Sequence, residues 1–167
     1  MKKEEVEKYK EEVINKLDES FKSKALEMFE NAKNGKVKEH VEKLSYRKVD
    51  ADEAQRLNDK IGLDLNGYEH NITNTDVIHI YKEHGNEKTE AFMGQRAVTS
   101  KDILLIPEIT KNYDDVILSP RTPKTSQNKV IIYRKQIGDE FVYLETIGGK
   151  KNRELRSKSL RIVKNKN

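Results

Sequence analysis

The spacing of apolar residues changes along the chain from a helical period to strict alternation, and this change constrains the fold more than any other feature. Before residue 116 apolar residues recur every three or four positions, as on one face of an amphipathic helix. From Val116 onward they alternate with polar residues, as in strands with one buried face. Helices followed by an antiparallel sheet of about four strands predict the α+β fold class, with the helices on one face of the sheet.

The first 45 residues carry a narrow apolar stripe flanked by lysine and glutamate. The stripe predicts one long amphipathic helix over residues 2–33 and a second, shorter helix over residues 37–44. Such a stripe suits packing on one partner surface or self-association through helices. We therefore expect two parts, a helical N-terminal arm over residues 1–45 and an α+β domain over residues 46–167.

Capping residues divide the middle of the chain into short elements. Asp50 or Asp52 can cap a helix that ends near Gly62, and residues 63–71 are typical of a short strand or extended segment. Further on, Thr99 or Ser100 caps a short helix that Pro107 breaks or resets, and Ile109 begins a last helical turn.

Two of the four histidines, His79 and His84, lie on a predicted helix that Asn74 or Thr75 caps and Gly85 closes. Five residues correspond to about 140° around a helix, so both imidazoles cannot bind one metal ion from it. His84 shares a side with the apolar residues and is expected to face the body of the protein. His79 shares a side with Glu83, a candidate orienting partner four residues on. For either histidine alone, a structural role is the simpler interpretation.

A polar loop follows this helix, and it is longer than a plain connection requires. Functional residues are concentrated in such loops, and this loop carries Gly94, Gln95 and Arg96.

The alternating region predicts a hairpin and a closing strand. The turn residues are Ile137-Gly138-Asp139 and Gly148-Gly149. The expected strands are residues 116–118, 129–136, 140–147 and 154–164.

One face of this sheet is expected to present aromatic and charged side chains together. Tyr133 and Lys135 share one face of their strand and Arg134 lies on the other, while Tyr143 and Glu145 share a face of the next strand. One face of the sheet could therefore display tyrosine, lysine and glutamate together. The final strand adds Arg156, Lys158, Ser159 and Arg161. Aromatic rings beside cations suit a single-stranded nucleic acid, although an ordinary solvated sheet face has the same pattern.

Charge and composition narrow the class of protein. Residues 121–167 contain 13 basic and 4 acidic residues, whereas residues 61–120 contain 5 basic and 10 acidic residues. A concentration of positive charge on one segment is expected of a surface that binds phosphate. The chain has no cysteine, which excludes disulfides and thiolate zinc sites. It shows no P-loop, GxGxxG or G-x-S-x-G motif. With no apolar run after the charged N-terminus, we expect no signal peptide, no membrane insertion and action in the cytoplasm.

Residues 76–90 (DVIHIYKEHGNEKTE) and 93–108 (MGQRAVTSKDILLIPE) resemble the phage-associated branch of the barnase, EndoU, colicin E5/D and RelE-like nucleases. These domains occur as C-terminal toxin modules on Mu F-like head morphogenesis proteins and related polymorphic toxins. The resemblance covers residues 67–164. The family typically has Lys-Thr where this chain has Lys158-Ser159, and often an arginine where it has Met93.

The resemblance implies a metal-independent endoribonuclease toxin that needs no cofactor and cleaves RNA, such as tRNA, by attack of the ribose 2′-hydroxyl on the adjacent phosphate. Its implied partners are the RNA substrate and a cognate immunity or antitoxin protein. The alternative is a non-catalytic nucleic-acid-binding or phage structural module. The expected catalytic residues are His79, His84, Lys135, Glu145, Lys158 and Ser159, with Glu145 as a second candidate base; the expected substrate-binding residues are Gln95, Arg96, Tyr133, Arg134, Tyr143, Arg156 and Arg161.

Overall fold

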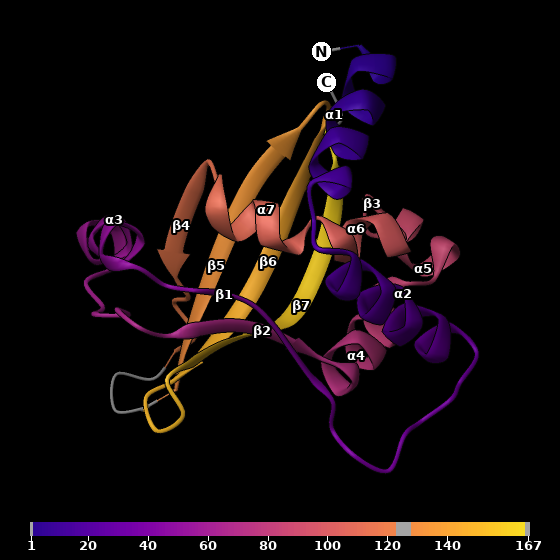
Figure 1. The fold of residues 1–167 in the computed structure, drawn as a ribbon. Coiled ribbons are helices and arrows are strands. Elements are labelled where there is room, and N and C mark those ends of the chain that lie inside the picture. Colours follow the sequence, from indigo (N-terminus) through magenta and orange to yellow (C-terminus); the bar gives the residue numbers. More distant parts are fainter. Residues whose placement is uncertain (1, 123–127, 166–167) are drawn as a thin grey trace.

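The computed structural model describes residues 2–122 and 128–165 and has the expected α+β class: two helices come first, three strands alternate with further helices, and four strands come last (Figure 1). Its helices are α1 (Lys3–Asn15), α2 (Glu19–Lys33), α3 (Ala51–Ile61), α4 (Asn74–His84), α5 (Glu87–Phe92), α6 (Ser100–Leu104) and α7 (Ile106–Lys111). Its strands are β1 (Lys43–Lys48), β2 (Glu69–Thr73), β3 (Gln95–Arg96), β4 (Asp115–Leu118), β5 (Asn128–Ile137), β6 (Glu140–Gly149) and β7 (Glu154–Lys164).

The sheet is larger than expected and is not purely antiparallel. Within the described residues its order is β1-β2-β7-β6-β5-β4, with β3 also paired to β7, which makes seven strands rather than about four. Strand β2 runs parallel to β7, and the other neighbouring pairs are antiparallel. The hairpin of β5 and β6 and the final strand β7 confirm the alternating pattern. The additional strands β1, β2 and β3 come from segments with no such alternation.

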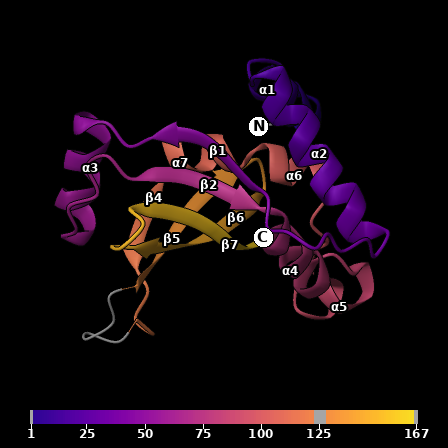
Figure 2. The ribbon, with the colours of Figure 1, turned by 60° about the horizontal axis from the view of Figure 1, so that its bottom comes forward.

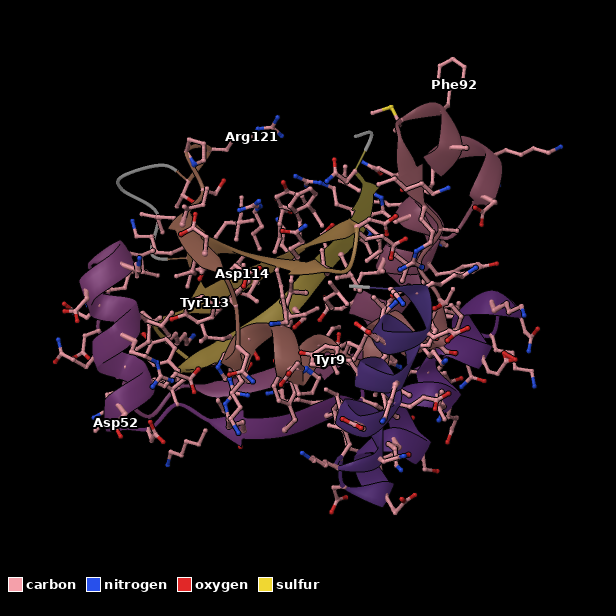
Figure 3. The ribbon with its side chains drawn as sticks, turned by 90° about the horizontal axis from the view of Figure 1, so that it is seen from above. Tyr9, Asp52, Phe92, Tyr113, Asp114 and Arg121 are labelled. Carbon is pink, nitrogen blue, oxygen red and sulfur yellow. The ribbon has the colours of Figure 1, made fainter. Side chains whose placement is uncertain are left out.

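One face of the sheet is buried beneath helices and the other is open. Side chains such as Ile131, Leu144 and Leu160 are fully buried on the inner face, where α7 crosses β5 and β6 (Figure 1). Phe92 and Arg121 project away from the side of the sheet on which Tyr9 of α1 lies (Figure 3). We call the partly exposed side of β5, β6 and β7 the open face; it carries Arg134, Phe141, Tyr143, Glu145 and Arg161.

Helix α4 lies along the edge of β7 at the margin of the open face. It starts where β2 ends, because the Thr73 hydroxyl accepts a hydrogen bond from the Asp76 backbone N–H and caps the helix. The cap is thus one or two residues earlier than the expected Asn74 or Thr75. Strand β2 pairs with the beginning of β7, and α4 packs against β7 as well (Figure 2). Strand β3 pairs with β7 near its other end.

The N-terminal segment differs from the expected helices. The helix over residues 2–33 is two helices, because the Asp18 carboxylate accepts hydrogen bonds from the backbone N–H groups of Ser20 and Phe21 and begins α2. The expected second helix over residues 37–44 is wrong, since Leu44 lies in β1.

Helix α2 contributes five buried residues to the core: Phe21, Ala25, Met28, Phe29 and Ala32. The strand β1 extends across the expected boundary between residues 45 and 46. That division of the chain into an arm and a domain remains a prediction.

In the middle of the chain, helices begin and end at capping residues. Asp50 and Gly62 bound α3 as expected. The polar loop after α4 contains α5, which Asn86 caps, and the short strand β3. Pro107 lies in the first turn of α7. Proline has no backbone N–H, but an N–H group at this position would have no acceptor within the helix. No helix in residues 2–122 or 128–165 is long and apolar enough to cross a membrane.

Candidate active site

An open groove of about 620 Å³ lies between α4 and strands β6 and β7. It brings together five residues that the sequence proposed for a site, although they are separated by up to 80 positions. The groove is lined by Thr75, Asp76, Ile78, His79, Lys82, Glu83, Glu145, Ile147, Arg156, Lys158 and Ser159. Of these, the sequence predicted His79, Glu145, Arg156, Lys158 and Ser159.

A β-bulge in β7 places two consecutive side chains at the groove. Glu145 pairs with Ser159 and Thr146 pairs with Ser157, so Lys158 is an extra residue without a partner position on β6. A regular strand would send neighbouring side chains to opposite faces. The bulge interrupts that alternation, and both Lys158 and Ser159 line the groove.

His79 lies on the exposed side of α4. Its side chain is 61% exposed and its Nε2 lies 3.0 Å from Oε1 of Glu83, which is the contact expected from the spacing of four residues. The imidazole is therefore oriented by Glu83 while remaining open to the groove.

Glu145 and Lys158 reach the groove from the sheet without protein partners. Within residues 2–122 and 128–165, no hydrogen bond or ion pair engages the side chains of Glu145, Lys158 or Ser159. Side chains with no hydrogen bond or ion pair inside the described protein are available to a ligand.

His84 does not join this groove. Its side chain is 19% exposed, and its Nδ1 lies 3.2 Å from Oε2 of Glu90, a carboxylate that is almost fully buried. His84 faces the body of the protein, as its helical register predicted. Its Nε2 also lies 3.9 Å from Oε2 of Glu83, so the two histidines flank one carboxylate, but only His79 lines the groove.

Arg96 is held in an ion-pair network away from the groove. Its guanidinium donates hydrogen bonds to both carboxylate oxygens of Asp102 and of Glu140. Burial alone would lower the pKa of Arg96, but these hydrogen bonds outweigh it and raise that pKa. The neighbouring Gln95 pairs with Val163 in the sheet and does not line the groove.

Tyr133 and Lys135 lie on the opposite side of the sheet from the groove, so the expectation that they share a face with Tyr143 is wrong. The register pairs Tyr133 with Leu144, and the ring is fully buried against Tyr113. Lys135 donates a hydrogen bond of 2.5 Å to the backbone oxygen of Asn112.

Three other expected binding residues form a row across the open face. Arg134, Tyr143 and Arg161 are direct cross-strand neighbours on β5, β6 and β7. The Arg161 guanidinium lies over the Tyr143 ring, with its carbon 4.6 Å from the ring centroid, and Arg134 lies 4.7 Å over Phe141. The row adjoins the groove, because Tyr143 is two positions from Glu145 on the same face.

Several lining residues were missed by the sequence prediction. On α4 they are Thr75, Asp76, Ile78 and Lys82. The signal that could have found most of them is helical spacing, since Thr75, Ile78, His79, Lys82 and Glu83 recur at intervals typical of one helix face.

No group of three or more histidine, aspartate or glutamate side chains is arranged to hold a metal ion in the part of the chain that the structure describes.

A groove that combines an imidazole, a carboxylate, a hydroxyl and several cations on an α+β scaffold can move protons and stabilise a phosphate, the two tasks of a nuclease. Residues 47–167 match the model of the family described as phage-Barnase-EndoU-ColicinE5/D-RelE like nuclease3, and the chain belongs to this family. The match includes the whole groove. No curated protein and no solved structure matches the chain.

Proposed function

We propose that the protein is a metal-independent endoribonuclease and that the groove between α4, β6 and β7 is its active site. The observation that carries the proposal is the convergence of His79, Glu145 and Lys158 from three elements on one open groove. The family supports nuclease activity, and the proposal adds the RNA substrate and the mechanism.

In this proposal the groove residues divide the chemistry of 2′-hydroxyl attack. Glu145 takes the proton of the ribose 2′-hydroxyl, and the oxygen forms a bond to the adjacent phosphorus. The bond from phosphorus to the 5′-oxygen breaks, and protonated His79 gives its proton to that oxygen. The products are a 2′,3′-cyclic phosphate and a 5′-hydroxyl. A carboxylate can only accept a proton, whereas a protonated imidazole can donate one from either nitrogen, which supports this assignment.

The cations and the hydroxyl act on the phosphate. Lys158 and Arg156 stabilise the negative charge that develops on the nonbridging oxygens, and Ser159 donates a hydrogen bond to one of them. None of these groups requires a cofactor.

The open face supports an unpaired RNA strand as the substrate. Its row of Arg134, Tyr143 and Arg161 places ring surface beside positive charge next to the groove. Bases stack on such rings, and guanidinium groups bind the phosphates between them. Duplex RNA would keep its bases stacked and unavailable to these rings.

The direct test is incubation of the purified protein with total tRNA in excess EDTA. We expect fragments with 5′-hydroxyl ends. RNA that stays intact at high protein concentration would contradict the proposed function and would leave salt-sensitive binding as the role of the basic face.

We also propose that the protein acts as a toxin in cells. Its target is RNA of the cytoplasm, and its partner is an immunity or antitoxin protein. This proposal predicts that expression of the chain in bacteria arrests growth and that co-expression of the cognate partner restores it. Unimpaired growth at high expression of the active protein would count against it.

A further inference from the structure

Arg156 meets a nearly buried carboxylate at the wall of the groove. Its Nε lies 3.3 Å from Oδ2 of Asp76, and the two side chains are 46% and 8% exposed. Both residues line the groove, Arg156 from β7 and Asp76 from the first turn of α4. No other ion pair or hydrogen bond engages the Arg156 side chain among the described residues.

The Asp76 carboxylate is fixed by the start of α4. The Thr73 hydroxyl donates a hydrogen bond of 2.8 Å to Oδ2 of Asp76, and it accepts one of 3.1 Å from the Asp76 backbone N–H. Because Thr73 is itself buried at the end of β2, this reciprocal cap ties the carboxylate to the sheet.

Helix capping alone does not require a charged group at this position. An asparagine could accept the same hydrogen bond from Thr73 through its amide oxygen. Burial raises the pKa of Asp76, and the hydrogen bond from Thr73 and the charge of Arg156 offset only part of this effect. A raised pKa means that folding favours the neutral form, so the ionised carboxylate lowers stability at neutral pH and this cost disappears as pH falls through the raised pKa.

We infer that Asp76 is a positioning residue, which holds Arg156 by its Nε so that the two terminal nitrogens are presented to the substrate phosphate. A guanidinium is a planar fork of five donors, and an ion pair formed on the Nε side leaves the Nη1 and Nη2 edge available. That edge matches two oxygens of a phosphodiester. The inference rests on the proposed function, since the phosphate it names is the one that is cleaved.

The test is the substitution Asp76→Asn, which keeps an acceptor for Thr73 and removes the anion that holds Arg156. We expect kcat for RNA cleavage to fall about 10- to 100-fold, because a misplaced charge stabilises the transition state poorly, while the unfolding midpoint at neutral pH stays the same or rises. The matched control is Asp18→Asn, which alters the capping carboxylate of α2 far from the groove. The control should cleave within about twofold of the unchanged protein.

The substitution Arg156→Lys distinguishes a positioning role of Asp76 from a structural role of Asp76. Lysine keeps the charge and lacks the fork, so Asp76→Asn should have no further effect on kcat in the Arg156→Lys protein. Equal losses from Asp76→Asn in both backgrounds, or unchanged cleavage by Asp76→Asn alone, would overturn the inference.

NMR of the Arg156 Nε–Hε group gives a readout that does not depend on cleavage. Asp76→Asn should shift this signal, and inorganic phosphate should shift the terminal guanidinium signals of the unchanged protein but not those of the Asp76→Asn protein. If the protein cleaves no RNA but these shifts appear, the proposed function fails and the positioning of Arg156 stands. If Asp76→Asn does not change the chemical shift of the Arg156 Nε–Hε group, the inference is overturned, whether or not the protein cleaves RNA.

Discussion

His79 and His84 belong to one helix, yet their surroundings give them different tasks. His79 is exposed at the groove beside Glu83, whereas His84 is mostly covered and contacts the buried carboxylate of Glu90. The sequence could not choose between them as acid or base, because both lie in the same motif. Of these two histidines, only His79 lines the groove.

This difference predicts opposite effects of two alanine substitutions. His79→Ala should lower kcat by about 10²- to 10⁴-fold, the usual loss of a general acid, without changing the unfolding midpoint. His84→Ala should lower the free energy of unfolding by about 1–3 kcal/mol, because it leaves the Glu90 carboxylate buried with no partner. Cleavage assays and urea titrations of both variants measure the two effects. Loss of cleavage by a stable His84→Ala protein would contradict the assignment.

At the scale of elements, the β-bulge in β7 decides which cation reaches the groove. Without it, Lys158 and Ser159 would point to opposite faces of the sheet. Because the bulge is one extra residue in an otherwise regular strand, its position could not be read from the alternation of residues 154–164.

Lys158→Ala should therefore lower kcat about 10²-fold while leaving stability unchanged, since the side chain has no partner inside the described protein. Lys164→Ala is the matched control, because Lys164 is exposed at the end of the same strand and outside the groove. Steady-state cleavage of a short RNA distinguishes the two. Equal losses in both variants would indicate a general effect of charge on RNA binding.

A second set of contacts holds β1, β2 and α3 together through Glu53. Its carboxylate accepts hydrogen bonds from Arg47 and lies 2.7 Å from Nε2 of His70. Burial alone would raise the pKa of Glu53, but the contacts with His70 and Arg47 outweigh it and hold that pKa at about 2. Burial also lowers the pKa of His70 below its usual value.

Both shifts predict a loss of stability in acid. The unfolded chain takes up a proton at His70 below its usual pKa of about 6.5, and the folded protein resists it, so stability falls with pH from there. The lowered pKa of Glu53 adds a further loss as pH falls from 4.5 to about 2. Urea unfolding across this range should show a smaller acid loss for Glu53→Gln than for the unchanged protein. Parallel curves for the two proteins would contradict this role of Glu53.

The elements that the sequence predicted well are those with a complete local signal. Strand β7 has its alternation, and α3 has both a capping Asp50 and a closing Gly62. Strand β2 was predicted only in part, because it is buried along most of its length and has no alternating pattern.

The candidate site was predicted in part for a related reason. The sequence identified the types of residue in the groove. The face of the sheet on which each side chain lies depends on the pairing register, and this register follows from contacts between segments. The register of β5 on β6 buries Tyr133 and places Arg134 beside Tyr143. The role of Asp76 was missed because its partner Arg156 is distant in sequence.

At the scale of the whole molecule, α2 belongs to the core although it precedes the region that matches the family. Burying each of Phe21, Met28 and Phe29 contributes about 1.5–3 kcal/mol, which together is comparable with the whole stability of a small domain. Helix α1 is held by contacts such as the hydrogen bond from the Tyr9 hydroxyl to Glu108.

Two truncations should therefore behave differently. Removal of residues 1–16 should lower the melting temperature but keep a cooperative transition, since α2 and its Asp18 cap remain. Removal of residues 1–45 should abolish cooperative unfolding, because it also deletes α2 and half of β1. Circular dichroism during heating measures both. A cooperatively folded, active fragment of residues 46–167 would instead establish residues 1–45 as a separate arm.

In the proposed function, this groove cleaves RNA through the ribose 2′-hydroxyl with no metal ion. The most direct measurement is mass spectrometry of the products from a short single-stranded RNA in EDTA, beside the same RNA with a 2′-deoxy sugar at the cleaved position. The account predicts a 2′,3′-cyclic phosphate and a 5′-hydroxyl from the first RNA and no cleavage at that position of the second. Cleavage of the 2′-deoxy strand at the same position, or of neither strand, would contradict it.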